Sequence, residues 1–208
     1  MAERVLRERD VAADPITQIE RWIDDARNAE VRDWDAMVVA TADADGVPSA
    51  RMVLVRGVDA RGLRFYTNHD SAKGRDLAAN PRAALVLHWR ELGRQVRVTG
   101  RVTKLTSEES LEYWQSRARA SRLSAWASHQ SQPIADRAAL EAAVEEVHRR
   151  FGDDGDIPLP PFWGGYLVEP DEVELWQHRD DRLHDRLRYR RALGGNAHDG
   201  WLLERLQP

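Results

Sequence analysis

The order of apolar and polar residues predicts one helix followed by several strands in the first third of the chain. From Pro15 to Asn28, apolar residues recur at helical spacing behind an Asp-Pro start, which is typical of an amphipathic helix. Strand-like runs follow at 36–43, 49–59 and 63–68. Because the turn sequences DADGVP and DARG separate these runs, we expect a three-strand meander.

Helix-like and strand-like stretches continue to the C-terminus without an internal repeat or a linker. Further helices are expected at 71–79, 106–117, 121–128 and 136–151. Further strands are expected at 82–89, 94–105, 165–170, 172–177, 185–191 and 200–206, with the loop 192–199 before the last. Strands in hairpins, with helices at the start and in the middle, favour an α+β fold with an antiparallel barrel or sandwich. Without βαβ alternation, a Rossmann fold is not expected.

Composition narrows the class of protein. The chain has 208 residues, of which 42% are apolar and 32% charged, so we expect a single domain over 1–208 with a flexible N-terminal arm at 1–13. The absence of cysteine excludes thiolate catalysis, cysteine-ligated zinc, iron–sulfur clusters and disulfides. No apolar run approaches the ~20 residues of a membrane span, and the N-terminus lacks the apolar stretch of a signal peptide. We therefore expect a soluble cytoplasmic protein.

Several common functional motifs are missing from the sequence. There is no HExxH, no P-loop and no GxGxxG, and the seven histidines show no spacing typical of metal ligands. Ser128 and His129 are neighbours, which is not the arrangement of a catalytic triad. The net charge of −4, with acidic residues among the arginines, argues against nucleic-acid binding. We therefore expect no metal and neither a nucleic-acid nor a membrane partner.

One group of residues favours binding of an anion. In the run RMVLVR at 51–56, Arg51 and Val53 share one strand face, and Arg56 lies on the other. The sequence Tyr-Thr-Asn then leads to Ser71 and Lys73 at the start of a helix. A helix N-terminus beside strand arginines can hold a phosphate, whereas the alternative is a solvated edge of charged residues.

A second group has helical spacing. Tyr113, Arg117 and Ser121 are each four residues apart, so a helix running through all three would bring them near one face around a phosphate. An ordinary amphipathic surface is the alternative interpretation. Near the C-terminus, strand alternation would place Arg182, His184 and Arg186 on one face. Two cations and an imidazole packed together favour an anionic ligand.

In this order and spacing, these motifs resemble the pyridoxine/pyridoxamine 5′-phosphate oxidase family over 14–208. The matching segments are RMVLVRG, FYTNHDSAKGRDLAANPRAAL, GRQVRVTGRV, EYWQSRARASRLSAWASHQSQPI, PPFWGGY, ELWQ and RLHDRLRYRR. The resemblance implies an antiparallel FMN-binding split β-barrel with peripheral helices, in a homodimer with FMN at the subunit interface. It also implies oxidation of pyridoxamine or pyridoxine 5′-phosphate, a small phosphorylated pyridine, to pyridoxal 5′-phosphate, with O2 reduced to H2O2.

The resemblance assigns residues by motif. FMN-binding residues would be Arg51, Met52, Val53, Leu54, Val55, Arg56, Tyr66, Thr67, Lys73, Gln95, Gln130, Ser131, Trp176 and Arg186. Substrate-binding residues would be Arg56, Tyr113, Arg117, Ser121, Arg182 and His184. Tyr113, Arg117 and Ser121 would hold the 5′-phosphate. Arg182 and His184 would cover and orient the pyridine ring, and they are the catalytic candidates.

The sequence departs from the family pattern in three places. Arg56 replaces a usual lysine, Ala72 replaces a usual arginine, and the chain starts roughly where the family's substrate-covering N-terminal segment ends. One alternative is a related flavin oxidase of the phenazine-biosynthesis type, which shares the flavin motifs but needs no phosphate-binding trio. A non-catalytic flavin-binding split barrel and a deazaflavin-using reductase on this fold are further alternatives.

Overall fold

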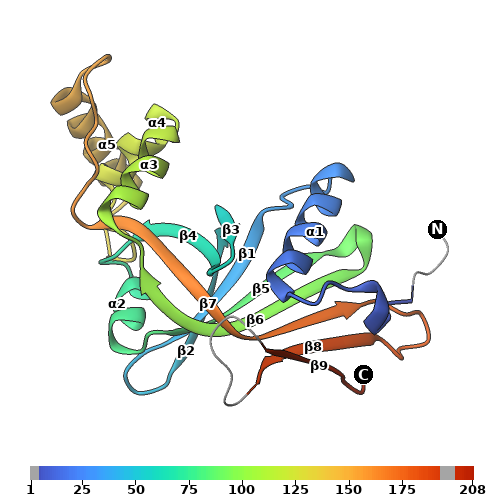
Figure 1. Cartoon of the computed structure of the whole chain (residues 1–208). Helices are drawn as coiled ribbons and strands as arrows, with labels where there is room; N and C mark the ends of the chain where they lie inside the picture. The colour runs from blue at the N-terminus through green and yellow to red at the C-terminus, as the bar shows by residue number, and fades with distance from the viewer. Residues whose placement is uncertain (1–4, 193–199) are drawn as a thin grey trace.

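Antiparallel strands of the computed structural model, which describes residues 5–192 and 200–208, form one nine-stranded sheet (Figure 1). The strands are β1 (Ala36–Ala42), β2 (Pro48–Leu54), β3 (Gly57–Asp59), β4 (Gly62–Asn68), β5 (Arg82–Trp89), β6 (Arg94–Lys104), β7 (Trp163–Gln177), β8 (Asp185–Arg191) and β9 (Trp201–Arg205). Their order is β2-β1-β5-β6-β7-β4-β3, and β8 pairs with β7 and with β9. The predicted loop 192–199 lies mostly outside the described residues.

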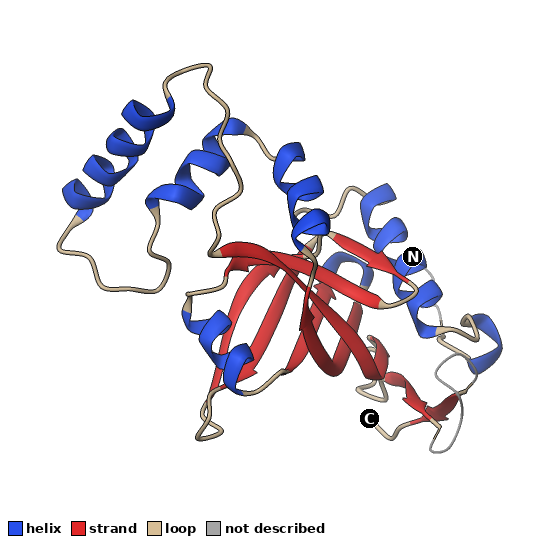
Figure 2. Ribbon diagram, turned by 60° about the vertical axis from the view of Figure 1, so that its left-hand side comes forward, coloured by secondary structure: helices blue, strands red, loops and turns tan. Residues whose placement is uncertain are grey.

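The expected three-strand meander is wrong. The run 49–59 splits after Leu54, so that β2 pairs with β1, whereas β3 pairs with β4 at the opposite end of the strand order. At the split, the Val55 amide donates to the Asp35 carbonyl (2.8 Å) and the Arg56 amide donates to the Arg64 carbonyl (2.8 Å). Since only two residues join the two end strands, the sheet must curl until its edges approach each other. The result is the curled half-barrel of Figure 2.

The predicted strands 165–170 and 172–177 are one strand, β7, with an irregularity in the middle. Gly100 of β6 pairs with Pro170 and Thr99 pairs with Glu172, which leaves Asp171 as an extra residue. A proline lacks the amide hydrogen of a regular ladder, and a β-bulge is one of the few positions in a sheet that tolerates it. Pro170 therefore marks a bulge here and not a turn.

Helices pack around the sheet as the local signals predict. They are α1 (Pro15–Asn28), α2 (Ala72–Ala79), α3 (Ser107–Ser116), α4 (Arg119–Ala127) and α5 (Arg137–Phe151), with short 3-10 turns at Glu8–Asp10 and Arg90–Leu92. Asp14 caps α1, Ser71 caps α2, and Thr106 forms a capping box with Glu109 at α3. Helices α3, α4 and α5 project from one end of the sheet (Figure 1).

The main core fills the curled sheet and joins both halves of the chain. Strand β1 alternates between buried and half-buried side chains, with Met37 and Val39 fully buried, and α1 adds Ile19 and Trp22 to the same cluster. A second cluster lies under α3–α5, around Trp114, Leu123, Ile157 and Trp163. Both clusters include residues of β7: the main core contains Val168, and the second cluster contains Trp163. The projecting helices are therefore anchored to the sheet through β7.

The N-terminal arm expected at 1–13 falls partly outside the described residues, which begin at residue 5. From there the chain packs on β8 and β9. The Leu6 amide donates to Asp185 (3.1 Å), the Tyr189 hydroxyl donates to the Ala12 carbonyl (2.6 Å), and Arg205 pairs with Glu8 (2.8 Å). The described part of the arm therefore follows the sheet surface.

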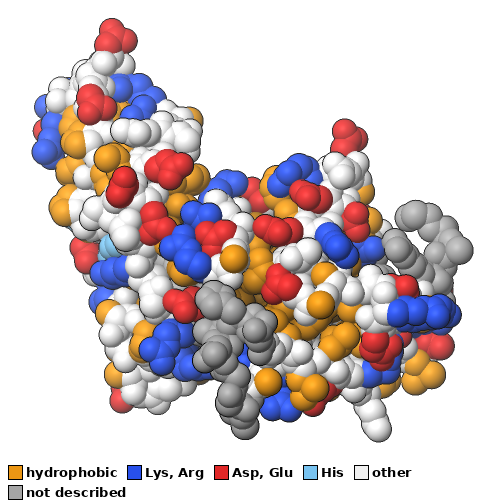
Figure 3. Space-filling model, viewed as in Figure 1, with side chains coloured by type: hydrophobic (Ala, Val, Ile, Leu, Met, Phe, Trp, Pro, Cys, Tyr) orange, Lys and Arg blue, Asp and Glu red, His pale blue; other side chains and the backbone are white. Residues whose placement is uncertain are grey.

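Surface charge and helix length bear on possible partners. Figure 3 shows basic and acidic side chains interspersed over one face. Among the described residues, no helix is long and apolar enough to cross a membrane. In the same residues, no group of three or more His, Asp or Glu side chains is arranged to hold a metal ion.

Candidate functional site

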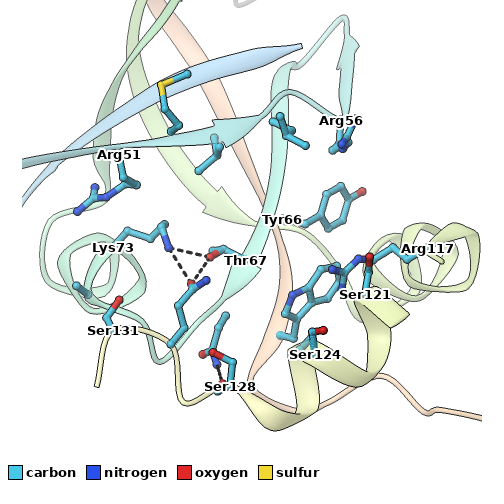
Figure 4. Close-up of a pocket in the computed structure, with 18 of the residues that line it drawn as sticks. Arg51, Arg56, Tyr66, Thr67, Lys73, Arg117, Ser121, Ser124, Ser128 and Ser131 are labelled. Atoms are coloured by element: carbon cyan, nitrogen blue, oxygen red, sulfur yellow. Dashed lines mark hydrogen bonds between the residues drawn. The ribbon is translucent and has the colours of Figure 1, made fainter. Parts of the chain in front are cut away.

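A pocket of about 1120 Å³ lies where β2, β4, the start of α2 and the helices α3 and α4 meet (Figure 4). Thirteen of the predicted site residues line it: Arg51, Met52, Val53, Leu54, Arg56, Tyr66, Thr67, Lys73, Tyr113, Arg117, Ser121, Gln130 and Ser131. The curl of the sheet explains this convergence, because it brings β2 opposite β4 although the two strands do not pair. Their separate motifs therefore form one site.

Lys73 lies at one end of the pocket in the first turn of α2. Its side chain is buried, and its ammonium group donates to Thr67 Oγ1 (3.0 Å) and Gln130 Oε1 (2.8 Å) (Figure 4). It also donates to Ser71 Oγ (3.3 Å). All three acceptors are neutral. Burial, as the main cause, and the positive charge of Arg51 together lower the pKa of Lys73 to about 8, against the opposing effect of Asp76. A buried cation with only neutral contacts suits an incoming anion.

Arg51 reaches the same end of the pocket from β2. Its guanidinium donates to Thr41 Oγ1 (2.6 Å) and to the backbone and side-chain oxygens of Ser49 (3.2 and 2.7 Å). Asp76 lies 3.7 Å from Arg51 Nη2 and is the nearest carboxylate that pairs with it in the described chain. Arg51 and Lys73 together exceed the charge of Asp76 by one unit, so this end of the pocket is cationic.

The second group of predicted residues lies at the other end of the pocket. The two helices expected here are separate: α3 ends at Ser116 and Arg117 has an extended backbone (ψ 143°), so the condition of one helix running from Tyr113 to Ser121 is not met. Ser116 Oγ bonds back to the Tyr113 carbonyl (2.8 Å), a local contact that competes with helix continuation. The two helices nevertheless direct Tyr113, Arg117 and Ser121 into the same pocket.

Tryptophan rings hold Arg117 in place. The guanidinium carbon lies 4.6 Å from the Trp163 ring centre and 5.3 Å from that of Trp114, within cation–π range. Burial lowers the pKa of Arg117, and its Nη1 atom is buried without a hydrogen-bond partner in the part of the chain that the structure describes. Beside it, the Tyr66 and Tyr113 rings stack with centres 4.0 Å apart. The rings therefore position a guanidinium whose Nη1 atom has no acceptor among the described residues.

Six predicted residues do not line this pocket. Val55 is buried in the core, at 5% exposure. Gln95, Trp176 and Arg186 are side by side in the sheet, because Gln95 pairs with Trp176 and Trp176 pairs with Arg186. The His184 ring lies 4.7 Å from the Trp176 ring. We call Gln95, Trp176, Arg182, His184 and Arg186 the β6–β8 group.

Strand alternation does not align Arg182, His184 and Arg186, so that part of the sequence prediction is wrong. Strand β8 begins only at Asp185, and Arg182 has a left-handed backbone (φ 66°) in the preceding loop. His184 Nδ1 accepts a hydrogen bond from the Arg179 amide (3.1 Å), which leaves Nε2 to carry the proton of the neutral ring. Arg186 donates two bonds to the buried Glu174 (2.9 and 3.1 Å).

The motif assignment missed several residues of the pocket. They include Trp163, Asn68, Ser124 and Ser128. Trp163 stands in the segment PPFWGG, where two glycines after an aromatic residue signal close packing, and a Cβ at Gly164 would lie 2.9 Å from His69. Ser121, Ser124 and Ser128 recur at helical spacing, and that pattern marks the α4 face toward the pocket.

Comparison with known families identifies two matching regions. The family model described as pyridoxamine 5′-phosphate oxidase matches residues 23–151. The model described as pyridoxine 5′-phosphate oxidase C-terminal dimerisation region matches residues 163–208. Together they include every residue of the pocket and of the β6–β8 group.

Individual proteins similar to this chain extend over nearly its whole length. The pyridoxine/pyridoxamine 5′-phosphate oxidase of Burkholderia multivorans is 53% identical over 203 residues, which cover 98% of this chain and 93% of that protein. The protein of the same name from Salinibacter ruber is 52% identical over 198 residues, covering 95% and 91%.

Solved structures give the same fold. PhzG from Burkholderia lata 383, in complex with tetrahydrophenazine-1-carboxylic acid, superposes with a TM-score of 0.90 at 37% identity over 100% of both chains. A pyridoxamine 5′-phosphate oxidase-related, FMN binding protein from Nostoc punctiforme superposes with a TM-score of 0.74 at 22% identity, covering 95% and 100%. The second likeness supports the fold alone. On the family models and the near-full-length relatives, the chain belongs to the pyridoxine/pyridoxamine 5′-phosphate oxidase family.

Proposed function

We propose that this chain is an FMN-dependent oxidase that converts pyridoxamine 5′-phosphate and water to pyridoxal 5′-phosphate and ammonia, or pyridoxine 5′-phosphate to pyridoxal 5′-phosphate, with O2 as acceptor and H2O2 as product. The observation that carries the proposal is a single pocket with one cationic end at Arg51 and Lys73 and another at Arg117 (Figure 4). FMN and a phosphorylated substrate bring one phosphate each, and each phosphate favours a cationic site. Relatives 52% and 53% identical to this chain carry the name of this activity.

The residues at the Lys73 end fit the phosphate of FMN. Lys73 is buried among neutral oxygens, and Arg51 and Ser131 line the same end, so a phosphate there gains charged and neutral donors together. The pocket volume of about 1120 Å³ exceeds the roughly 300–1,000 Å³ of typical small-molecule sites. Both a flavin and a pyridine substrate therefore have room.

The chemistry that FMN supplies when bound is two-electron oxidation at the substrate C4′ carbon, with the electrons passed to O2. The chain's own residues bind and orient. Tyr113, Arg117 and Ser121 hold the substrate phosphate, and their fixed positions make the reaction of the two bound molecules effectively unimolecular. The buried rings of Trp114 and Trp163 pack on Arg117 and shield that part of its guanidinium from water.

The β6–β8 group completes the site from a second copy of the chain. None of its five residues lines the pocket of its own chain, and four of them fall within the matched dimerisation region. In this arrangement Gln95, Trp176 and Arg186 contact FMN across the interface. Arg182 and His184 cover the pyridine ring, and His184 offers an Nε2 proton because its Nδ1 already accepts a bond. Residues 1–208 then act as one domain, consistent with a core cluster that runs from Leu6 to Tyr189.

The direct test is oxidation of pyridoxamine 5′-phosphate by the FMN-loaded protein under air. We expect pyridoxal 5′-phosphate and H2O2 in equal amounts, measured by absorbance and by a peroxidase-coupled assay. Pyridoxamine without its phosphate is the matched control, and we expect its kcat/KM to be about 100-fold lower because the Arg117 end has no partner. A protein that binds FMN but does not oxidise the phosphorylated amine would refute the proposal.

Oxidation of a tricyclic phenazine precursor is the second candidate, because PhzG superposes at a TM-score of 0.90. The acid in that complex carries no phosphate by name, whereas Nη1 of Arg117 here is buried beside Tyr113 and Ser121 without an acceptor among the described residues. That observation favours the phosphorylated substrate. Turnover of tetrahydrophenazine-1-carboxylic acid, without turnover of pyridoxamine 5′-phosphate, would reverse the preference.

Mixed dimers test the proposal that two copies build each site. Lys73→Met disables the part of the site in the pocket, and Arg186→Met disables the part supplied by the β6–β8 group. Each variant alone should therefore be inactive. Co-expressed with different tags, half of the dimers are mixed and hold one intact site, so activity should return to about a quarter of wild type. Lys73→Met mixed with Arg117→Met is the control and should stay inactive. If the first mixture also stays inactive, the shared site is refuted.

A further inference from the structure

We propose that Asp35 is a positioning residue for the phosphorylated substrate, because it holds the guanidinium of Arg56 at the Arg117 end of the pocket. This inference rests on the proposed function and adds to it a residue that does not line the pocket. Arg56 does line it, two residues after β2 ends at Leu54. Asp35 stands just before β1 begins.

The contact between the two side chains is short and partly shielded from water. Arg56 Nη1 donates to Asp35 Oδ2 over 2.6 Å, and the side chains are 32% and 17% exposed. Among the residues that the structure describes, Asp35 is the one ion-pair partner of Arg56. A guanidinium carries five N–H donors, so one bond to Asp35 leaves donors for a phosphate oxygen.

The backbone on both sides of the pair is fixed by the seam of the half-barrel. The Val55 amide donates to the Asp35 carbonyl (2.8 Å), and the Arg56 amide donates to the Arg64 carbonyl of β4 (2.8 Å). Next to them, Ala36 pairs with Leu54 in the β1–β2 ladder. Exposed ion pairs lose most of their value to side-chain entropy, but this pair joins two anchored backbones and keeps one geometry.

Charge at this end of the pocket gives the pair a second effect. Burial is the main cause that lowers the pKa of Arg117, and the positive charge of Arg56 adds to it. The two guanidiniums therefore repel each other before a phosphate arrives. The carboxylate of Asp35, a residue that does not line the pocket, compensates the charge of Arg56, so both cations can stay in position for one anion.

The geometry also explains why arginine suits position 56. The planar fork of arginine can direct Nη1 to a carboxylate and another nitrogen to a phosphate, whereas the lysine ammonium is a single point of charge on a flexible stem. The single nitrogen of a lysine at position 56 could not lie in the arginine positions of both Nη1 at Asp35 and a second nitrogen at the substrate phosphate. Asp35 and Arg56 thus act as a unit.

Two variants of Asp35 and one neighbouring control test the proposal. Asp35→Ala should raise KM for pyridoxamine 5′-phosphate about tenfold with kcat within about twofold, since Arg56 loses its anchor. Asp35→Asn should raise KM only about threefold, because its side-chain oxygen still accepts from Nη1. Asp33→Asn removes the same charge from an exposed turn residue, with 74% of its side chain accessible, and should change nothing.

A binding measurement separates this inference from the proposed function. Isothermal titration of pyridoxal 5′-phosphate into the FMN-free protein should give the same tenfold loss in Asp35→Ala as the KM, whether or not the enzyme turns over. If Asp35 acted only by reducing positive charge, both variants would bind the phosphate more tightly, and that result would overturn the proposal. Equal affinity in all variants would overturn it as well.

A double-variant cycle tests whether the two residues act together. Arg56→Lys alone should weaken pyridoxal 5′-phosphate binding about tenfold, and Asp35→Ala with Arg56→Lys should be no weaker than either single variant. Losses that multiply to about a hundredfold would mean that the residues act independently, and the positioning role would be refuted. Melting temperatures of all variants, compared with wild type, exclude unfolding as the cause.

Discussion

A substitution of Arg117 separates an effect on stability from an effect on binding, since Nη1 of this half-buried residue is buried without an acceptor in the described residues. We consider Arg117→Met, which removes the charge and keeps most of the length. In the FMN-free protein this change removes two cation–π contacts, to Trp114 and Trp163, and also removes a buried donor without a partner. These two effects have opposite signs.

The magnitudes can be compared. Leaving a buried donor unsatisfied costs about 1–3 kcal/mol, and each cation–π contact contributes about 0.5–2 kcal/mol. A methionine between the two rings adds favourable sulfur–aromatic contacts. We therefore expect the free energy of unfolding to stay within about 1 kcal/mol of wild type. Binding differs, because two charge-assisted bonds to a phosphate contribute at least ~3 kcal/mol, which corresponds to about a hundredfold in affinity.

The assay pairs urea denaturation of the FMN-free variant with its kcat/KM for pyridoxamine 5′-phosphate. Arg119→Met, two residues away, is the matched control. Its guanidinium donates to the carbonyls of Gly152 (2.6 Å) and Gly155 (2.5 Å), so its loss should lower stability by about 1–3 kcal/mol and leave kcat/KM unchanged. The two variants should therefore show opposite patterns.

The opposite result for Arg117→Met would refute the reasoning. A large loss of stability with normal kcat/KM would mean that Arg117 supports the fold and does not bind the substrate phosphate. Unchanged values of both would mean that its burial between the tryptophans has no functional purpose at this site.

Further tests concern Lys73, Glu174 and Gly74. The pKa of Lys73 in the FMN-free fold, about 8, lies below its ordinary 10.5, so between these values the unfolded chain binds more protons than the folded one. The free energy of unfolding should therefore rise from about pH 8 to 10. Urea titrations should show this rise in wild type and a smaller one in Lys73→Met, and an equal dependence on pH in both proteins would contradict it. Glu174→Gln should lower stability by about 1–3 kcal/mol, because the buried carboxylate pairs with two arginines, and an unchanged urea midpoint would argue against that role. Gly74→Ala should cost at least ~2 kcal/mol, since its Cβ would lie 2.0 Å from the His69 carbonyl oxygen, and a wild-type melting temperature would disprove that clash.

Local sequence signals predicted most individual elements. The expected helix at 15–28 and the expected strand at 82–89 coincide with α1 and β5, and the capping box at Thr106 starts α3. These features depend on contacts between residues a few positions apart. Hydrogen bonds of a cap and alternation along a strand are present in the sequence itself.

Pairing between distant segments could not be predicted in the same way. The run 49–59 has strand character throughout, but the tertiary structure divides it between the two ends of the sheet at Val55 and Arg56. The sequence separates the strands 165–170 and 172–177 at Asp171, whereas pairing with β6 joins them in one strand with a bulge. Each outcome depends on a partner strand that local periodicity does not specify.

The same division holds for the site. The types and spacing of Lys73, Arg117 and His184 favoured anionic ligands, because clustered cations and an imidazole are costly without one, and the family resemblance added the contact of His184 with the pyridine ring. Only the fold showed that these residues lie in different places. It buries Lys73 against Gln130, 57 positions away, and leaves His184 outside that pocket. The sequence by itself thus determined which chemical groups are available, since that is a property of residue types. The curl of the sheet decided which of them meet, since distances between remote segments arise only when the core packs.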